Sequence, residues 1–207
     1  MEAQIRHRRL TRLNNKQFYA LISRMKYITR WSLMRNSIQE NIQEHSHMTA
    51  VIAHALGIIG NRIYGKAHNP EHLATVAMFH DATEILTGDM PTPIKYQNPD
   101  IVKAYRQVEA YAADRLVQML PKELRGDYAA LLGEDVHDSE EYRLVKAADK
   151  LSALIKCVEE RKAGNTEFIS AERSTRESIE KMGIPEADYF MEHFMPAFEL
   201  DLDELGI

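Results

Sequence analysis

The stretch AMFHDATEILTGDMPTP, residues 77–93, carries the pattern from which both the fold and the site are predicted. The apolar residues AMF run directly into His80-Asp81, and Glu84 follows three residues later. On a helix, side chains three and four residues apart lie on neighbouring parts of one face, so these three polar groups would project together. The following glycine and prolines predict the end of the helix and an ordered loop. We therefore expect a polar site at the rim of a helical core.

Two distant segments carry side chains of the same chemistry. His45 lies in QEHSHM, near the start of a helical pattern, and Asp149 lies in VKAADKLSAL, within another. Imidazole and carboxylate groups are suitable ligands for a divalent metal such as Mn, Fe, Co, Ni or Zn. A carboxylate on a mostly apolar stretch needs either a partner or a metal. For Asp149 the alternative is a salt bridge to Lys146 or Lys150, and for His80-Asp81 it is an ion pair that stabilises a helix end.

Helical periodicity extends over most of the chain and predicts an all-α fold. Asn69-Pro70 supplies an N-cap and a proline at the first helical position, and Asp138 with Glu141 resembles a capping box. No convincing strand and no internal repeat is visible, and 207 residues with 44% hydrophobic content suit one domain with a sizeable core. The predicted helices cover residues 15–28, 43–60, 69–86, 99–120, 121–132, 138–163, 166–182 and 186–198.

Charge divides the chain into two parts. Residues 1–35 contain nine lysines and arginines and one acidic residue, whereas the remainder contains 17 basic and 30 acidic residues. We interpret residues 1–14 as a basic N-terminal extension and residues 15–207 as one helical domain. An acidic body disfavours a broad surface for polymeric nucleic acid, although a local basic segment could still bind one phosphate group.

Cysteine usage and hydropathy bear on the compartment. The single cysteine, Cys157, excludes an intrachain disulfide and indicates a reducing cytoplasm. No apolar run approaches the ~20 residues that a membrane span requires. The first twelve residues lack the apolar core of a signal peptide. These observations predict a cytoplasmic protein with no membrane partner.

The order His, His-Asp, Asp on helical segments resembles the HD-domain metal-dependent phosphohydrolases. The stretches RWSLMRN, EHS, HDATEILTGDMPTPIKY and KAADKLSALIKCVEE are similar to the bacterial 5′-deoxynucleotidases of that superfamily. The resemblance covers roughly residues 15 to 205 and ends in YFMEHFMPAFELDLDEL. Its HDATEILTGDMPTPIKY segment is highly specific, whereas a bare His-Asp pair is not. The resemblance implies a single HD-type helical bundle that hydrolyses deoxyribonucleoside 5′-monophosphates to deoxynucleoside and phosphate.

The resemblance also assigns the metal chemistry. His45, His80, Asp81 and Asp149 match the metal ligands, and Glu84 matches the residue that positions or activates the attacking water. The implied cofactor is one divalent transition-metal ion, commonly Co or Mn, and the implied assembly is a homodimer. A bound divalent ion lowers the pKa of its water, which agrees with a carboxylate placed one turn from His80.

The remaining assignments concern the substrate. Arg30 matches an arginine that orients the 5′-phosphate, for which its planar guanidinium is well shaped. Trp31 matches the residue beside the sugar, where its bulk would disfavour a 2′-hydroxyl. Asp89 would accept a hydrogen bond from the 3′-hydroxyl or protonate the leaving oxygen. The other substrate-contacting positions implied are Thr92, Pro93, Ile94 and Lys95, together with His45 and Asp149 beside the metal.

Two other functions use the same residues. An HD-type enzyme that removes triphosphate from a deoxynucleoside triphosphate would have the same ligands, and the extra N-terminal arginines could serve its longer phosphate chain. A nucleotide-binding regulator without turnover is the second alternative. The presence of all four candidate ligands together with Glu84 disfavours the regulator, because a degenerate site would usually lack one of them.

Overall fold

The computed structural model describes residues 16–95, 97–132 and 139–206. Within these ranges the regular structure is helical, and the one β-type pairing is an isolated bridge between Thr29 and Asn41. The all-α prediction is therefore confirmed for the described residues. The predicted basic extension at residues 1–14 lies outside them. None of the described helices is long and apolar enough to span a membrane.

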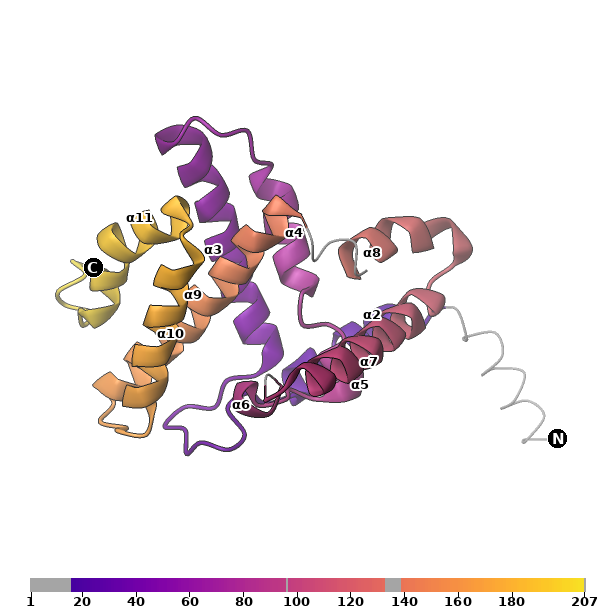
Figure 1. Cartoon of the computed structure of the whole chain (residues 1–207), viewed down its shortest axis with the longest axis horizontal. Helices are drawn as coiled ribbons and strands as arrows, with labels where there is room; N and C mark the ends of the chain where they lie inside the picture. The colour runs from indigo at the N-terminus through magenta and orange to yellow at the C-terminus, as the bar shows by residue number, and fades with distance from the viewer. Residues whose placement is uncertain (1–15, 96, 133–138, 207) are drawn as a thin grey trace.

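The helices are arranged as a main bundle with a second group of helices beside it (Figure 1). In chain order the elements are α2 (Phe18–Ile22), η1 (Met25–Tyr27), α3 (Ile42–Ile63), α4 (Pro70–Phe79), α5 (Glu84–Thr87), α6 (Thr92–Lys95), α7 (Pro99–Gln118), η2 (Lys122–Leu124), α8 (Arg125–Leu132), α9 (Glu140–Lys162), α10 (Phe168–Met182), α11 (Pro185–His193) and η4 (Met195–Glu199).

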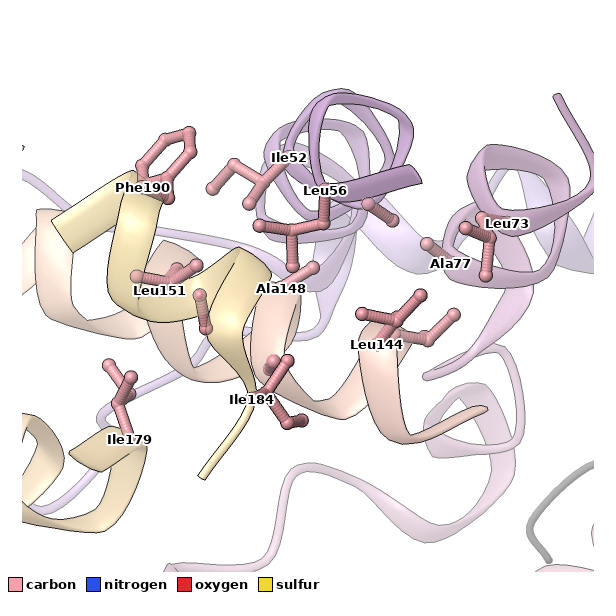
Figure 2. Packing of buried hydrophobic residues seen from close by; sticks show 14 of the residues in the cluster. Ile52, Leu56, Leu73, Ala77, Leu144, Ala148, Leu151, Ile179, Ile184 and Phe190 are labelled. Atoms are coloured by element: carbon pink, nitrogen blue, oxygen red, sulfur yellow. The ribbon is translucent and has the colours of Figure 1, made fainter. Parts of the chain in front are cut away.

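The main bundle is built around α3, which packs on both α4 and α9, while α10 covers α9 and α11 packs on α3. Figure 2 shows Leu56 of α3, Leu73 of α4 and Leu151 of α9 in the same apolar cluster, and all three side chains are fully buried. Burying a leucine side chain stabilises a fold by roughly 1.5–3 kcal/mol. The helices that carry His45 and Asp149 are therefore fixed by apolar packing along their length.

The second group of helices has a separate apolar cluster. Phe18 of α2 is fully buried, and its ring lies 4.7 Å from that of Tyr128 on α8 and 6.4 Å from that of Phe79 at the end of α4. Leu116 of α7 is buried in the same cluster. Because Phe79 belongs to α4, this cluster connects the second group of helices to the main bundle close to His80.

Polar side chains determine where the long helices begin. The Asn41 side chain accepts hydrogen bonds from the first turn of α3 and Glu44 completes a capping box, so α3 begins one turn before His45. Asn69 caps α4 as predicted, with Pro70 in its first turn. At α9 the cap is Ser139, whose hydroxyl accepts from the backbone N–H of Tyr142. The residue predicted for this role, Asp138, lies outside the described residues.

The prediction of one helix over residues 15–28 is wrong. The described part of this segment forms the short α2 followed by the turn η1, and the chain then reverses direction. Backbone hydrogen bonds hold the reversal: Arg30 N–H donates to the Glu40 carbonyl, and Ile42 N–H donates to the Ile28 carbonyl. In a helix that continued past residue 28, the Ile28 carbonyl would face the next turn of that helix. It accepts instead from the distant Ile42 N–H, so a long-range pairing replaces the helix that local periodicity predicts. We call residues 29–41 the substrate loop, after the residues in it that the sequence resemblance predicts to contact the substrate.

The predicted helix over residues 69–86 is divided in two. α4 ends at Phe79, His80 is its C-cap, and α5 begins at Glu84. The imidazole of His80 explains the end of α4, because its Nδ1 donates to the Ala77 carbonyl at 2.7 Å. In a continuing helix that carbonyl would accept from the N–H of Asp81. The loop predicted after Gly88 also contains a helical turn, α6.

Gly57 permits a close approach between α3 and α4. A Cβ atom built at Gly57 would lie 2.9 Å from the Leu73 Cδ1 atom and 3.1 Å from the Pro70 Cα atom. The second of these neighbours is backbone, so it could yield only through movement of α4 itself. The absence of a side chain at Gly57 therefore sets the separation of the two helices that carry His45 and His80.

Candidate active site

Four predicted side chains converge where α3, the end of α4 and α9 meet. One ligand atom each from His45, His80 and Asp81 lies within 4.8 Å of the others. Asp149 Oδ1 lies 3.0 Å from His45 Nε2 and 3.9 Å from His80 Nε2. Residues more than 100 positions apart in the chain are thus brought into one cluster, as the sequence predicted.

Each imidazole is oriented by its Nδ1 atom, the ring nitrogen that does not face the carboxylates of the cluster. His80 Nδ1 must carry the proton because its partner, the Ala77 carbonyl, can only accept. His80 Nε2 is buried and lies 3.1 Å from Asp81 Oδ2 and 3.9 Å from Asp149 Oδ1, at ion-pair distance from both carboxylates. His45 Nδ1 lies 3.1 Å from the Ser152 hydroxyl, and its Nε2 faces Asp149. Burial opposes protonation of His80, but Asp81 and Asp149 raise its pKa to about 10, so Nε2 carries a proton when no metal is bound. A divalent ion bound here would displace that proton, and the outer nitrogen of each ring already gives the imidazole the orientation that a metal ligand needs.

The two aspartates of the cluster are charged at neutral pH. Burial alone would raise the pKa of Asp149, but the His45 and His80 imidazoles together with Lys146 hold it well below its ordinary value. Burial likewise opposes ionisation of Asp81, and His80 and Arg30 overcome it and lower the pKa of Asp81. The cluster therefore presents two imidazoles and two carboxylates, a ligand set that fits a divalent transition metal.

Glu84 lies beside this cluster at the start of α5. Its side chain is buried, and its Oε2 atom has no hydrogen-bond partner among the described residues. Burial and the nearby carboxylates of Asp81 and Asp89 raise the pKa of Glu84 to about 9. Several carboxylates gathered in one place favour a bound cation, which would offset their mutual repulsion. The unpartnered oxygen of Glu84 is available to hold a water molecule.

Arg30 places a buried positive charge next to the metal ligands. Its Nη1 lies 3.3 Å from Asp81 Oδ2, and its Nε donates to Glu40 Oε2 at 3.1 Å. The guanidinium side chain is 12% exposed and stays charged, because Asp81, Asp149 and Glu40 outweigh the effect of burial on its pKa. A planar guanidinium in this position can bind two oxygens of a phosphate.

Trp31 follows Arg30 in an unusual backbone conformation. Its φ angle is 58°, the one positive value at a non-glycine position in the described part of the chain. The indole Nε1 donates to Glu40 Oε2 at 2.9 Å, and the ring packs against Phe168 of α10 at a centroid distance of 5.3 Å. A bulky residue in the left-handed region costs on the order of 1–3 kcal/mol and persists only where its surroundings hold it.

Asp89 lies next to the substrate loop. The backbone N–H of Trp31 is close enough to the Asp89 carboxylate to oppose a rise in its pKa, which places the two predicted substrate residues together. Burial raises the pKa of Asp89, although the positive charge of Arg30 opposes that shift. The preceding Gly88 has a φ of 76°, which turns the chain after α5 and brings Asp89 to this position.

The structure places the last group of predicted substrate residues in α6, which packs on α7. Lys95 is tied to α7: its ammonium group lies 2.8 Å from Glu109 Oε1 and 4.6 Å from the centre of the Tyr105 ring. Lys95 is one of the predicted substrate-contacting positions, and in this arrangement much of its positive charge is directed towards Glu109. The other three residues of the turn are Thr92, Pro93 and Ile94.

Two polar residues of the site were not predicted. Ser152 contacts His45 Nδ1, and its position three residues after Asp149 on α9 could have indicated a shared helix face. Glu40 contacts both Arg30 and Trp31 through one carboxylate oxygen. The local sequence SIQEN gives no periodic or motif signal for Glu40, because its role depends on the chain reversal of the substrate loop.

Comparisons with known proteins agree with this geometry. The family model described as 5′-deoxynucleotidase YfbR-like matches residues 17–198. The chain is 47% identical over 194 residues to a 5′-deoxynucleotidase of Vibrio atlanticus (strain LGP32), which covers 94% of this chain and all of that protein. It is 50% identical over 190 residues to a 5′-deoxynucleotidase of Yersinia pestis (strain Pestoides F), which covers 92% of this chain and 96% of the relative.

Solved structures share the fold at lower sequence identity. An HD-domain phosphohydrolase from Listeria innocua superposes with a TM-score of 0.78 at 23% identity, over 90% of both chains. The HD phosphohydrolase DatZ of cyanophage S-2L, solved with dA and one catalytic Zn²⁺ ion, superposes with a TM-score of 0.59 at 18% identity and covers 84% of this chain and 93% of that one. The predicted HD-type helical fold is therefore confirmed.

The chain accordingly belongs to the YfbR-like family of 5′-deoxynucleotidases. The family match begins at residue 17 and thus follows the basic N-terminal segment. Its extent agrees with the resemblance found in the sequence, which covers residues 15 to 205.

Proposed function

We propose that the cluster of His45, His80, Asp81 and Asp149 is the metal centre at which this 5′-deoxynucleotidase hydrolyses a deoxyribonucleoside 5′-monophosphate. Membership of the family makes the chain a phosphomonoester hydrolase. The observation that supports the proposed centre is the convergence of two imidazoles and two ionised carboxylates, with His80 Nε2 buried 3.1 Å from Asp81 Oδ2 and 3.9 Å from Asp149 Oδ1. A divalent ion would replace the proton that this imidazole otherwise carries between the two carboxylates.

The proposed cofactor is one divalent transition-metal ion, with Co or Mn as the expected choice. When bound, it would supply Lewis-acid polarisation of a phosphate oxygen and lower the pKa of the attacking water. The roles of the protein side chains follow from their positions. His45, whose pKa is lowered by burial, would offer a neutral ring nitrogen, and His80 would do so once binding of the ion displaces its Nε2 proton. Asp81 and Asp149 would offer negative charge.

Glu84 and Arg30 would act on the reacting groups directly. The unpartnered carboxylate oxygen of Glu84 would hold the water that attacks phosphorus and accept its proton, since a carboxylate of raised pKa is a stronger base once ionised. Arg30 would bind the phosphate oxygens and hold the ester in line with that water. As the P–O5′ bond breaks, Asp89, whose pKa is also raised, would protonate the leaving oxygen or bind the 3′-hydroxyl.

The substrate loop would select the sugar. Trp31 lies beside Arg30 with its ring packed on Phe168, so its bulk would occupy the space that a 2′-hydroxyl requires. The turn from Thr92 to Lys95 would contribute further substrate contacts from the side of α6. Assembly as a homodimer and a cytoplasmic location remain predictions from the sequence.

Phosphate release from dAMP, dATP and AMP in the presence of Mn or Co, with a chelator control, tests this function. We expect release from dAMP, little from AMP and dATP, and none after metal removal. Tripolyphosphate from dATP without phosphate from dAMP would instead support the triphosphohydrolase alternative. Metal binding without turnover of any nucleotide would support the regulator.

A further inference from the structure

Glu40 is a partly buried carboxylate close to the active site with no role in the chemistry described so far. It lies at the end of the substrate loop, just before the Asn41 cap of α3, and its side chain is 14% exposed. Its Oε1 atom is 4.0 Å from His45 Nδ1, on the side of that imidazole turned away from Asp149. This position suits a group that acts on its neighbours rather than on the substrate.

A single oxygen of Glu40 holds both residues proposed to recognise the substrate. Glu40 Oε2 accepts from Arg30 Nε at 3.1 Å and from Trp31 Nε1 at 2.9 Å. Hydrogen bonds to an ionised acceptor are about twice as strong as neutral ones and are geometrically restrictive. The carboxylate therefore fixes the guanidinium plane and the indole ring relative to each other.

The contact with Arg30 also determines which of its nitrogens remain for phosphate. Nε donates to Glu40 Oε2, whereas Nη1 lies 3.3 Å from Asp81 Oδ2, so the two carboxylates contact different nitrogens of the guanidinium. Without Glu40, Asp81 would be the one remaining ion-pair partner of Arg30 among the residues that the structure describes. Glu40 thus keeps Arg30 from turning wholly towards a proposed metal ligand.

The contact with Trp31 has a consequence for sugar selection. The indole has one N–H donor, and that donor is directed to Glu40. The ring consequently offers no hydrogen bond to compensate a 2′-hydroxyl, and its Phe168 contact limits its movement. The same carboxylate helps to hold Trp31 in its left-handed backbone conformation.

We infer that Glu40 is a positioning residue that sets the preference for deoxyribose by holding Trp31 and Arg30 in one fixed arrangement. This inference rests on the proposed function of the site. The base of the substrate loop is closed by backbone bonds, including the one from Arg30 N–H to the Glu40 carbonyl, so replacing the side chain leaves that closure in place. A substitution of the Glu40 side chain should therefore change the orientation of Arg30 and Trp31 rather than the folding of the chain.

Substitution of Glu40 by glutamine and by alanine tests the inference. Glutamine keeps one neutral acceptor, whereas alanine keeps none. For the ratio of kcat/KM on dAMP to that on AMP, we expect a fall of about fivefold in Glu40→Gln and about tenfold in Glu40→Ala, with a higher KM for dAMP in both. Glu159→Gln is the matched control, because Glu159 lines the same 220 Å³ pocket as Glu40 but has no contact with Arg30 or Trp31 among the described hydrogen bonds.

The second readout does not depend on turnover. Trp31 is the single tryptophan of the chain, so intrinsic fluorescence reports its surroundings directly. Losing the bond to Glu40 should shift its emission to longer wavelength and increase acrylamide quenching, while Glu159→Gln should leave both unchanged. Should Glu40→Ala fail to fold, Glu40→Gln and Trp31→Phe remain informative, since phenylalanine removes the N–H but not the ring.

A double-mutant cycle separates the two contacts of Glu40. In a Trp31→Phe background, Glu40→Gln should no longer change the dAMP-to-AMP ratio, while it should still raise the KM for dAMP through Arg30. An active chain in which Glu40→Gln keeps either the ratio or the Trp31 emission of the unmodified protein overturns the inference. If the unmodified chain releases no phosphate from dAMP, the proposed function is wrong and the sugar-selecting role of Glu40 is overturned with it.

Discussion

The proposed metal centre and the substrate loop meet at one site but are held in different ways. His45 and Asp149 project from long helices whose apolar faces are buried against each other and against α4. Arg30 and Trp31 lie in an irregular segment, and a few polar contacts fix their side chains. Packing of the core positions the reaction chemistry, whereas individual hydrogen bonds position the groups that select the substrate.

The far end of the substrate loop shows the same dependence on polar contacts. The backbone N–H groups of Ser37 and Ile38 donate to the buried carboxylate of Glu160 on α9. Lys156 pairs with Glu160 and also donates to the Ile38 carbonyl, and Asn165 donates to Glu160 as well. A buried ion pair thus anchors the substrate loop to α9. The helices of the proposed metal centre are held by apolar packing instead.

The largest expected effect comes from a substitution at the proposed metal centre rather than in the substrate loop. Glu84→Gln should lower kcat by about a thousandfold, or about 4 kcal/mol in activation free energy, because an amide cannot accept the proton of water. Binding of dAMP with the metal, measured by calorimetry, should remain nearly unchanged. Glu71→Gln, at an exposed position in the first turn of α4, is the control. Full activity in Glu84→Gln would remove Glu84 from the mechanism.

A smaller effect is expected from Glu160, which anchors the substrate loop but does not belong to the proposed metal centre. Burial opposes ionisation of Glu160, but Lys156, Asn165 and the loop N–H groups lower its pKa to about 2. A lowered pKa in the folded state stabilises the protein above the ordinary pKa of about 4.5. That stabilisation is lost as the pH falls from about 4.5 to about 2.

Glu160→Gln should accordingly cost about 2 kcal/mol of unfolding free energy at pH 7. The variant should also lose less stability than the unmodified chain when the pH is lowered from 5 to 3, as denaturant titrations at both pH values would show. Its metal content should stay unchanged, while its KM for dAMP should rise. Metal loss in Glu160→Gln would contradict the independence of the two regions.

The smallest expected effect concerns sugar selection alone. Trp31→Ala should reduce the preference for dAMP over AMP by about tenfold, because it opens the space expected for a 2′-hydroxyl. Initial rates over a range of both nucleotides give that ratio. An unchanged ratio would mean that Trp31 packs against Phe168 without contacting the sugar.

The sequence predicted the bundle better than the loop for a physical reason. The apolar spacing and the cap of α4 are local signals, so Asn69-Pro70 marked a helix start that the structure contains, and the helix predicted from residue 99 begins at Pro99. The positions of the proposed ligands followed from the same periodicity together with a known motif.

Long-range contacts account for what the sequence did not predict. The helix expected over residues 15–28 is interrupted because the chain pairs with Asn41, which no local pattern encodes. The helix expected to continue through His80 ends at that residue because the His80 imidazole donates a hydrogen bond to the Ala77 carbonyl. Glu40 acquires its partners through the same chain reversal.

Gly57 has a consequence for anyone who redesigns this enzyme. It lies three turns along α3 from His45 and contributes no functional group, yet a methyl group there would press on the backbone at Pro70. That pressure would act on α4, which ends at His80. Libraries that vary only the residues lining the active site would leave the spacing of α3 and α4 intact. A glycine-to-alanine replacement at Gly57, chosen to stabilise the helix by its propensity, would alter the distance between the proposed metal ligands His45 and His80.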